Sequence, residues 1–239
     1  MLTQEILQNK KILIVAAHPD DELLGLGATM HKLIKSNSVE TRVVILGEGI
    51  TSRSDKRDEE VWKKELEIHH KNIEDARLAI GYGEVKTHNL PDNRFDSVPL
   101  LDIIKIIEKE KENFKPDVIF THHSGDLNID HQRTFAAVLT ASRPMAGETV
   151  QTIITFETPS ATEWNSYSDS NQFSPNLFFE VSEEDMNAKI RGMESYQFEK
   201  REYPHPRSPE ALKYRARYWG LTVGAAYAEA FNVVRSIIR

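Results

Sequence analysis

The 239-residue chain contains no cysteine. Disulfide bonds and thiolate metal ligands are therefore excluded, and any bound metal ion must be held by histidine, aspartate or glutamate. The chain also lacks an apolar run of about 18 residues, the length that a membrane-spanning helix requires. Its first apolar stretch, Ile12 to Ala17, is too short for a secretion signal and follows two lysines, so we expect a cytoplasmic protein.

Positive charge is in deficit, with a formal net charge of −7. This balance gives no basic footprint for nucleic acid or for an anionic membrane, so the expected partner is a small molecule. With 39% hydrophobic residues the chain can bury a full core, and we expect one domain over residues 1–239. The sequence has no internal repeat or low-complexity tract and is compatible with a homo-oligomer.

Strand and helix patterns alternate over residues 1–145. The apolar runs predict strands at residues 11–17, 41–46, 85–90 and 117–122. The segments of helical periodicity predict helices at residues 20–35, 58–80 and 100–112. His69 and His70 lie in the charged second helix, where we expect both to be exposed. The alternation favours a Rossmann-like α/β core, with a mostly parallel sheet covered on both faces. In such sheets, ligand sites lie beyond the carboxyl ends of the strands.

The pattern changes in the C-terminal extension, residues 146–239. Two segments, 150–157 and 176–182, resemble strands with no helix between them. They predict an antiparallel extension, and the Ser/Thr/Asn/Pro-rich segment 158–175 predicts a mobile loop. Two helices are expected to follow, at about 183–200 and 209–237, joined by a proline-rich turn.

The first chemically suggestive cluster follows the first predicted strand. His18 and Asp21 are three residues apart across a tight turn and can converge on one point. Histidine nitrogen and aspartate oxygen suit a catalytic zinc, which needs about three protein ligands and an open position for water. Asp20 would point differently, as suits a carboxylate that takes a proton from activated water. Alternatively, Asp20 and Asp21 cap the following helix, and His18 packs in the turn.

A second cluster begins at the carboxyl end of the fourth predicted strand and therefore faces the same crevice. His131 can supply a third ligand, while Asp130 or a backbone carbonyl holds its other ring nitrogen. The remaining polar side chains can bind substrate or polarise a carbonyl: Asn128, Asp126 and one of His122 or His123. The alternative is a polar loop in which Asp130 caps a helix and the histidines lie on the surface.

These residues resemble the LmbE-like or PIG-L deacetylases, metal-dependent enzymes that remove acetyl groups from N-acetylglucosaminyl conjugates. The resemblance covers nearly the whole chain, through the segments AHPDDELLGLG, GEGITSR, LPDNRFD, GDLNIDH, HPRS and AEAF, of which the first and fourth are the specific ones. It implies zinc on His18, Asp21 and His131, with Asp20 as general base. It also associates Arg53 and Asp92 with sugar binding.

One position departs from the family pattern. Relatives have GHPDH in the second motif, with a histidine three residues before the ligand, where this chain has Asn128. An amide at this position can donate a hydrogen bond to the developing oxyanion. His205 is the leading replacement for the acid that protonates the leaving amine, because two flanking prolines would stiffen its loop. The alternative for His205 is an ordinary surface turn.

The sequence thus predicts a zinc-dependent hydrolase that removes the N-acetyl group from an N-acetylated amino sugar. His123 and Asp126 join Arg53 and Asp92 as candidate substrate contacts, and Fe²⁺ is an alternative metal. Two other functions stay open. One is a metal-dependent hydrolase of another amide or ester, and the other is a Rossmann-like module that binds a sugar or nucleotide without catalysis.

Overall fold

The computed structural model describes residues 7–36, 38–58, 60–166 and 171–238. Within these residues, seven strands form one sheet in the order β3-β2-β1-β4-β5-β7-β6. The first five are mutually parallel, which confirms the predicted α/β class. Their bounds are Lys10–Ala16 (β1), Val39–Gly47 (β2), Glu84–Leu90 (β3), Val118–His122 (β4) and Thr152–Phe156 (β5).

The strand order reverses beside β1. From β1 the chain moves outward through β2 to β3, then returns to β4 on the other side of β1. In register, Ile14 of β1 lies between Val43 of β2 and Phe120 of β4. The loops after β1 and β4 therefore leave the same edge of the sheet on either side of a switch point, where doubly wound folds place ligand sites.

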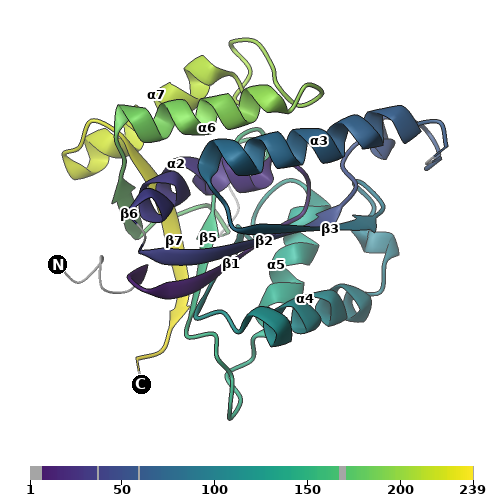
Figure 1. Ribbon diagram of the computed structural model, residues 1–239, viewed down its shortest axis with the longest axis horizontal. Coiled ribbons are helices and arrows are strands. Elements are labelled where there is room, and N and C mark those ends of the chain that lie inside the picture. Colours follow the sequence, from purple (N-terminus) through teal and green to yellow (C-terminus); the bar gives the residue numbers. More distant parts are fainter. Residues whose placement is uncertain (1–6, 37, 59, 167–170, 239) are drawn as a thin grey trace.

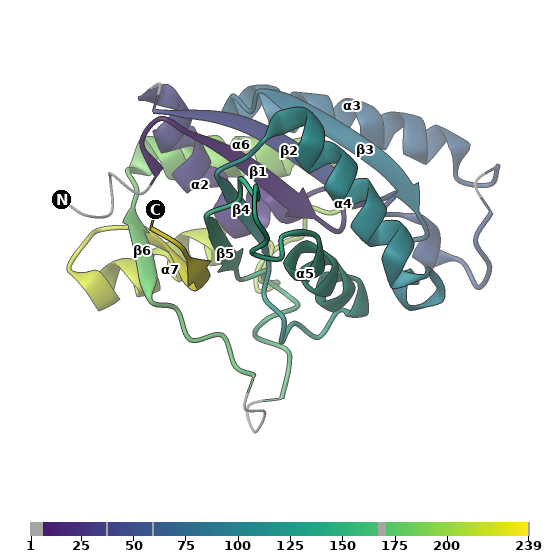
Figure 2. The ribbon, with the colours of Figure 1, turned by 90° about the horizontal axis from the view of Figure 1, so that it is seen from below.

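Helices cover both faces of the sheet (Figure 1). One face carries α2 (Asp21–Lys35), α3 (Lys63–Ile80), α6 (Glu183–Ser195) and α7 (Pro209–Val223), and the other carries α4 (Leu100–Phe114) and α5 (Ile129–Ala141). Figure 2 shows α4 and α5 side by side across their face. Successive β1 residues enter different cores, with Ile14 packed on the α2 side and Val15 on the other, because side chains alternate along a strand.

The C-terminal extension differs from its predicted form. The helix expected over 209–237 ends at Val223, and residues Ala228–Ser236 form strand β7 instead. Gly224 explains the stop, because its φ of 75° is the left-handed conformation that closes a helix. The strand then inserts Phe231 into the main core. The long helical prediction was wrong because helical spacing alone does not show that the chain turns at Gly224.

The pairing of the extension also differs from prediction. β5 extends the parallel sheet beside β4, and β7 runs antiparallel between β5 and β6 (Leu177–Glu180). An antiparallel extension is therefore present, but β6 and β7 form it rather than β5 and β6. Residues 167–170 of the predicted mobile loop lie outside the described residues.

No helix in the described ranges is long and apolar enough to cross a bilayer. The cytoplasmic location, the homo-oligomer and the single domain over residues 1–239 stay predictions. One prediction of exposure was wrong. His69 on α3 is only 2% exposed, whereas His70 is exposed as expected.

Candidate active site

Asp20 occupies an unusual backbone conformation in the turn between β1 and α2. Its φ is 105°, a region that residues other than glycine rarely adopt. The Asp20 N–H donates to Oε2 of Glu22 at 3.1 Å, and its carbonyl accepts the N–H of Leu23. Its side chain makes no capping hydrogen bond with α2. The capping interpretation is therefore wrong for Asp20, whose carboxylate instead lines a pocket.

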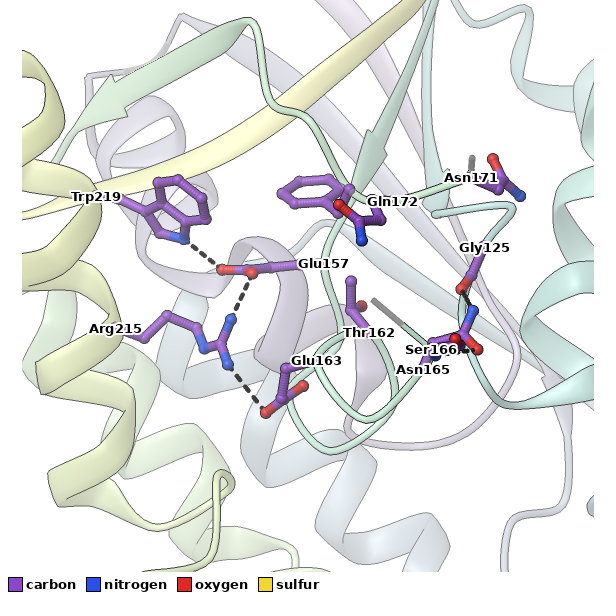
Figure 3. Close-up of a pocket in the computed structure, with 11 residues that line it drawn as sticks. Gly125, Glu157, Thr162, Glu163, Asn165, Ser166, Asn171, Gln172, Arg215 and Trp219 are labelled. Carbon is purple, nitrogen blue, oxygen red and sulfur yellow. Dashed lines mark hydrogen bonds and ion pairs between the residues drawn. The ribbon is translucent and has the colours of Figure 1, made fainter. Parts of the chain in front are cut away.

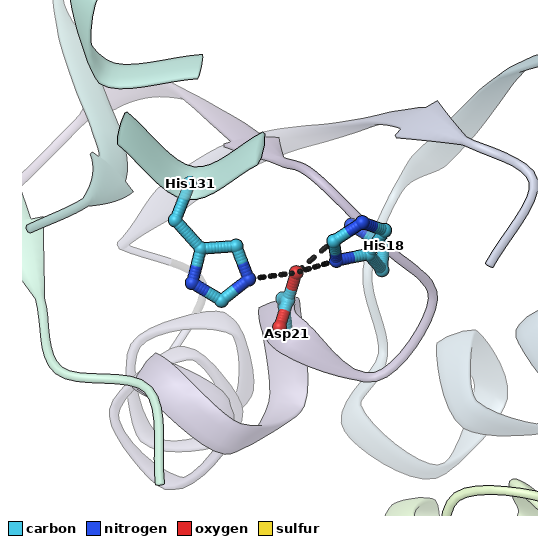
Figure 4. A group of neighbouring side chains, drawn as sticks. All are labelled: His18, Asp21 and His131. Carbon is cyan, nitrogen blue, oxygen red and sulfur yellow. Dashed lines mark hydrogen bonds and ion pairs between the residues drawn. The ribbon is translucent and has the colours of Figure 1, made fainter. Parts of the chain in front are cut away.

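His18, Asp21 and His131 meet at the carboxyl edge of the sheet (Figure 4). Nδ1 of His18 and Nε2 of His131 each lie 3.4 Å from Oδ2 of Asp21. One ligand atom from each residue lies within 4.8 Å of the other two, so the group could hold a metal ion. The structure thus brings together the three ligands that the resemblance implied.

Each of the two imidazoles has a carboxylate partner for its outer nitrogen. Nε2 of His18 lies 2.9 Å from Oδ2 of Asp130, and Nδ1 of His131 lies 2.9 Å from Oδ2 of Asp126. The expected partner of His131 was Asp130 or a carbonyl, and the structure shows Asp126 instead. Carboxylates in this position fix the ring orientation and tautomer of metal-binding histidines.

These carboxylates favour positive charge on both rings. Burial opposes protonation, yet the charge of Asp21 and the hydrogen bond to Asp126 raise the pKa of His131 to about 9. For His18, burial is likewise outweighed by hydrogen bonds to Asp130 and Asp21, which raise its pKa well above the usual value. A bound cation would find the same favourable field.

Asp21 supplies a further sign that a cation fits. Its Oδ2 accepts the N–H of His18 at 2.8 Å, but no described residue donates a hydrogen bond to its buried Oδ1. Burying a carboxylate with an unsatisfied oxygen is costly, and a cation bound at Oδ2, the oxygen that Figure 4 shows between the two rings, would neutralise the charge of the group. The donor set of imidazole nitrogen and carboxylate oxygen also suits zinc or ferrous iron.

His122 lies beside the candidate ligands but has a different role. Its ring stacks on His131 with the centroids 3.9 Å apart. Nε2 accepts the N–H of Ala17 at 2.9 Å, so the ring proton lies on Nδ1, 3.1 Å from Oγ1 of Thr158. Burial, followed by the charge of His131, lowers the pKa of His122 well below its usual value. These contacts fix the ring of His122 and favour its neutral form.

Overlapping groups around the same point could also hold a metal ion. Within the described residues these are His122 with Asp126 and His131, and His18 with Asp92 and Asp130. Each shares a histidine with the first group, so all three define one locality. Only the group of His18, Asp21 and His131 leaves both Asp126 and Asp130 free of the metal, so that each can orient one imidazole.

A polar cavity of about 280 Å³ opens in front of His18. We call it the His18 pocket. Six residues singled out from the sequence lie in its lining: His18, Asp20, Arg53, Asp92, Asn128 and His205. The tertiary structure thus gathers side chains from segments more than 180 residues apart in one cavity.

Arg53 and Asp92 enter this pocket from the loops after β2 and β3. Nη2 of Arg53 donates to Oε1 of Glu199 at 2.6 Å. Oδ2 of Asp92 accepts the hydroxyl of Ser52 at 2.6 Å, while its Oδ1 lies 3.4 Å from Nε2 of His18. Both side chains are therefore fixed before any ligand binds.

Asn128 and His205 also line the His18 pocket. Oδ1 of Asn128 accepts the N–H of Asp130, so Asn128 rather than Asp130 is the N-cap of α5, and its Nδ2 donates to Asn93 at 2.8 Å. Nδ1 of His205 accepts the N–H of Arg207 at 3.2 Å, which places the proton of the neutral ring on Nε2. Burial, then the charge of Arg207, lowers the pKa of His205.

Two remaining candidates lie away from the His18 pocket. His123 is buried, with Nε2 2.8 Å from the carbonyl of Asn171 and its ring packed on Phe173. Asp126 is fully buried beneath His131, and it also accepts the hydroxyl of Thr162 at 2.6 Å. Neither residue lines the pocket, so substrate contact does not follow from their positions.

The interpretation of the sequence missed Arg207 and Glu199. Nη1 of Arg207 lies 2.8 Å from Oδ2 of Asp20 and 3.2 Å from Oε2 of Glu199. Burial raises the pKa of Asp20 well above its usual range, and the charge of Arg207 opposes that rise. The HPRS segment contained the signal for Arg207, but the sequence predicted a role only for its histidine.

A family model described as GlcNAc-PI de-N-acetylase, PIG-L, matches residues 13–142, more than half of the chain. The chain belongs to the PIG-L family. The matched segment begins within β1 and extends through α5, and it includes His18, Asp20, Asp21 and His131. Membership supports deacetylase activity, which makes this PIG-L protein a hydrolase.

A curated relative agrees with this PIG-L assignment. It is an uncharacterized deacetylase, YaiS, of Escherichia coli strain K12, 28% identical over 199 residues that cover 79% of this chain and 91% of the relative. The similarity therefore extends beyond the segment matched by the family model.

Solved structures share the whole fold at low sequence identity. The N,N′-diacetylchitobiose deacetylase of Pyrococcus horikoshii superposes with a TM-score of 0.73 at 18% identity, over 95% of this chain and 84% of that one. GalB, a 4-carboxy-2-hydroxymuconate hydratase of Pseudomonas putida KT2440, superposes with a TM-score of 0.71 at 16% identity, over 96% and 98%. One fold therefore carries two kinds of reaction, and the reaction must be argued from the site.

Proposed function

We propose that this protein removes the N-acetyl group of an N-acetylated amino sugar. The reaction uses a divalent cation held by His18, Asp21 and His131, and zinc is the first candidate. The observation that carries the proposal is the meeting of these three side chains beside a pocket that also contains Asp20. The PIG-L assignment and the relatives that are deacetylases support the reaction class.

The bound cation would polarise the acetyl carbonyl and make water a better nucleophile at neutral pH. Asp20 is the base that receives the proton of the attacking water. Its carboxylate lines the pocket, and Arg207 holds it in one orientation at 2.8 Å. A base must lie within hydrogen-bond reach of the proton that it takes, and the pocket position of Asp20, after a left-handed turn, supports this role.

Two donors complete the proposed reaction. Asn128 uses one N–H of its amide on Asn93, and its second N–H is the donor to the developing oxyanion. His205 carries its proton on Nε2, because Nδ1 accepts a backbone N–H, and it donates a hydrogen bond to the departing nitrogen. The proton that the amine gains is the one that Asp20 took from the attacking water. Arg53 and Asp92 hold the hydroxyl groups of the sugar.

The substrate assignment is tested by a panel of N-acetylhexosamines, free and as glycosyl, nucleotide-linked and lipid-linked conjugates. Acetate and amine are measured with the protein as purified, after chelation, and after addition of zinc or ferrous iron. The proposal expects equal amounts of acetate and amine, loss of both with the chelator, and recovery with a metal. Absence of acetate release from every conjugate would overturn the proposal, and it is the result expected of a hydratase, which adds water to a double bond.

A further inference from the structure

A second cavity, of about 210 Å³, lies between the loop that follows β5 and helix α7 (Figure 3). We call it the Trp219 pocket, and the proposed reaction does not use it. Residues 160–166 separate it from the His18 pocket. Ser160 and Trp164 of this segment line the His18 pocket, whereas Thr162, Glu163 and Asn165 line the Trp219 pocket.

Two aromatic rings form part of the wall of the Trp219 pocket. Phe173 and Trp219 are both half-buried, and their rings meet nearly edge to face, with centroids 6.4 Å apart at 73°. Trp219 is fixed by its indole N–H, which donates to Oε1 of Glu157 at 2.6 Å. Rigid aromatic surfaces of this kind suit a ligand with one apolar face, such as the C–H face of a pyranose ring.

Buried carboxylates provide the polar part of the wall. Glu157 is 6% exposed and accepts hydrogen bonds from Trp219 and, at 2.6 Å, from Nη1 of Arg215. Nη2 of Arg215 lies 2.9 Å from Glu163. A carboxylate has about four acceptor positions, and these two donors occupy two of those on Glu157. The other positions suit hydroxyl groups, which donate hydrogen bonds without bringing charge.

The charge of this wall selects against anions. Among the described lining residues, one arginine lies between two carboxylates, so Glu157, Glu163 and Arg215 together carry a single negative charge. Phosphate or carboxylate groups would be repelled. Figure 3 shows Asn165 on the side opposite Trp219, where its amide donates to the carbonyl of Gly125 and accepts the N–H of Ser166. Its second N–H and second acceptor position can bond to hydroxyls.

From this combination we propose that the Trp219 pocket is a second saccharide site, which takes one uncharged hexopyranose ring. A cavity of about 150 Å³ holds a benzene ring. A cavity of about 210 Å³ therefore accommodates a six-membered ring with its hydroxyl groups. The ring stacks on the aromatic wall and donates hydroxyl protons to Glu157. The site is independent of the deacetylation proposed for the His18 pocket.

The tryptophans allow each pocket to be observed separately. Trp219 lines the Trp219 pocket, and Trp164 lines the His18 pocket. Trp62 lines neither of these pockets, and its indole N–H donates to Ser54. The full-length protein is labelled with ¹⁵N-tryptophan, and its indole N–H signals are assigned by single Trp→Phe variants. Glucose, which has no acetyl group to lose, and glucose 6-phosphate, its anionic counterpart, are then titrated.

We expect glucose to shift the Trp219 signal saturably and to leave Trp62 unchanged, with at least tenfold weaker binding of glucose 6-phosphate. Phe173→Ala should weaken glucose binding about tenfold, whereas Leu221→Ala, an exposed control on α7, should not change it. Glu163→Gln should reduce the difference in affinity between glucose and glucose 6-phosphate, because the substitution removes a negative charge from the wall. An unmoved Trp219 signal, or equal binding of the two sugars, would overturn the proposal. Acetate release does not enter these titrations, so either proposal can fail alone.

Discussion

Arg207 and Asp20 form an ion pair of 2.8 Å although 187 positions separate them in the chain. The arginine reaches Asp20 from the turn before α7, and the same Nη1 lies 3.2 Å from Glu199. The proposed base therefore depends on a contact with the C-terminal extension, outside the segment that the family model matches.

Replacing Asp20 with asparagine should abolish turnover while leaving metal binding intact. Asp20 does not belong to the candidate ligand group, and loss of a general base typically lowers kcat by about 10²- to 10⁴-fold. Acetate release and metal content are measured on the same preparation. Full residual activity in Asp20→Asn would remove this residue from the mechanism.

Replacing His131 with alanine should remove the metal itself. The variant loses one of three proposed ligands, and the remaining pair cannot close the site. Metal content after dialysis is compared with that of His123→Ala, whose ring points to Asn171 instead. Equal metal content in His131→Ala and the unmodified protein would contradict the assignment.

Asp126→Asn and Asp130→Asn should weaken metal affinity by about 10- to 100-fold without eliminating it. Each carboxylate holds the outer nitrogen of one proposed ligand, His131 or His18 respectively. Titration against a competing chelator gives the affinities. Asp96→Asn, on the surface, serves as the control, and affinities equal to this control would show that the carboxylates do not orient the ligands.

Arg207→Gln should lower kcat by about 10- to 100-fold, because a hydrogen bond between charged groups contributes about 1.5–3 kcal/mol. The matched control is Arg201→Gln. Arg201 also lines the His18 pocket but lies 3.9 Å from Glu199, and within the described residues it forms no hydrogen bond or ion pair with Asp20. If both variants lose activity equally, the loss reflects pocket charge rather than the position of Asp20.

His69 should make the protein less stable as the pH falls. Burial, then the charge of Arg53, lowers its pKa from 6.5 to about 4. The unfolded chain therefore binds the proton more readily between these values, and the free energy of unfolding decreases as the pH falls from 6.5 toward 4. The full effect is about 3 kcal/mol. Urea unfolding of metal-free His69→Gln should depend less on pH in this window, whereas exposed His70→Gln should behave like the parent.

Much of the fold could be predicted because local patterns repeat the physical requirements of each element. The buried run at residues 11–17 and the helical spacing at 20–35 correspond closely to β1 and α2. The end of α7 was missed because small residues at helical spacing continue past Gly224. The left-handed conformation of that glycine, the burial of Phe231 and the pairing of residues 228–236 with β5 and β6 distinguish strand β7 from more helix.

The candidate ligands could be predicted because His18 and Asp21 are neighbours in sequence and His131 follows a strand beside theirs. Roles that depend on distant partners could not. Local spacing does not tell whether Asp126 or Asp130 holds His131, whether His69 is buried, or which charge faces Asp20.

The amino-acid sequence by itself determined the chemistry available to this protein. Without cysteine any metal ligands must be nitrogen and oxygen donors, and the order of strands and helices brings both acidic-histidine clusters to one edge of a sheet. The tertiary structure decided which outer carboxylate orients which imidazole and that Arg207 holds Asp20. These contacts join residues far apart in the chain, and packing of the C-terminal extension against the parallel sheet sets their distances.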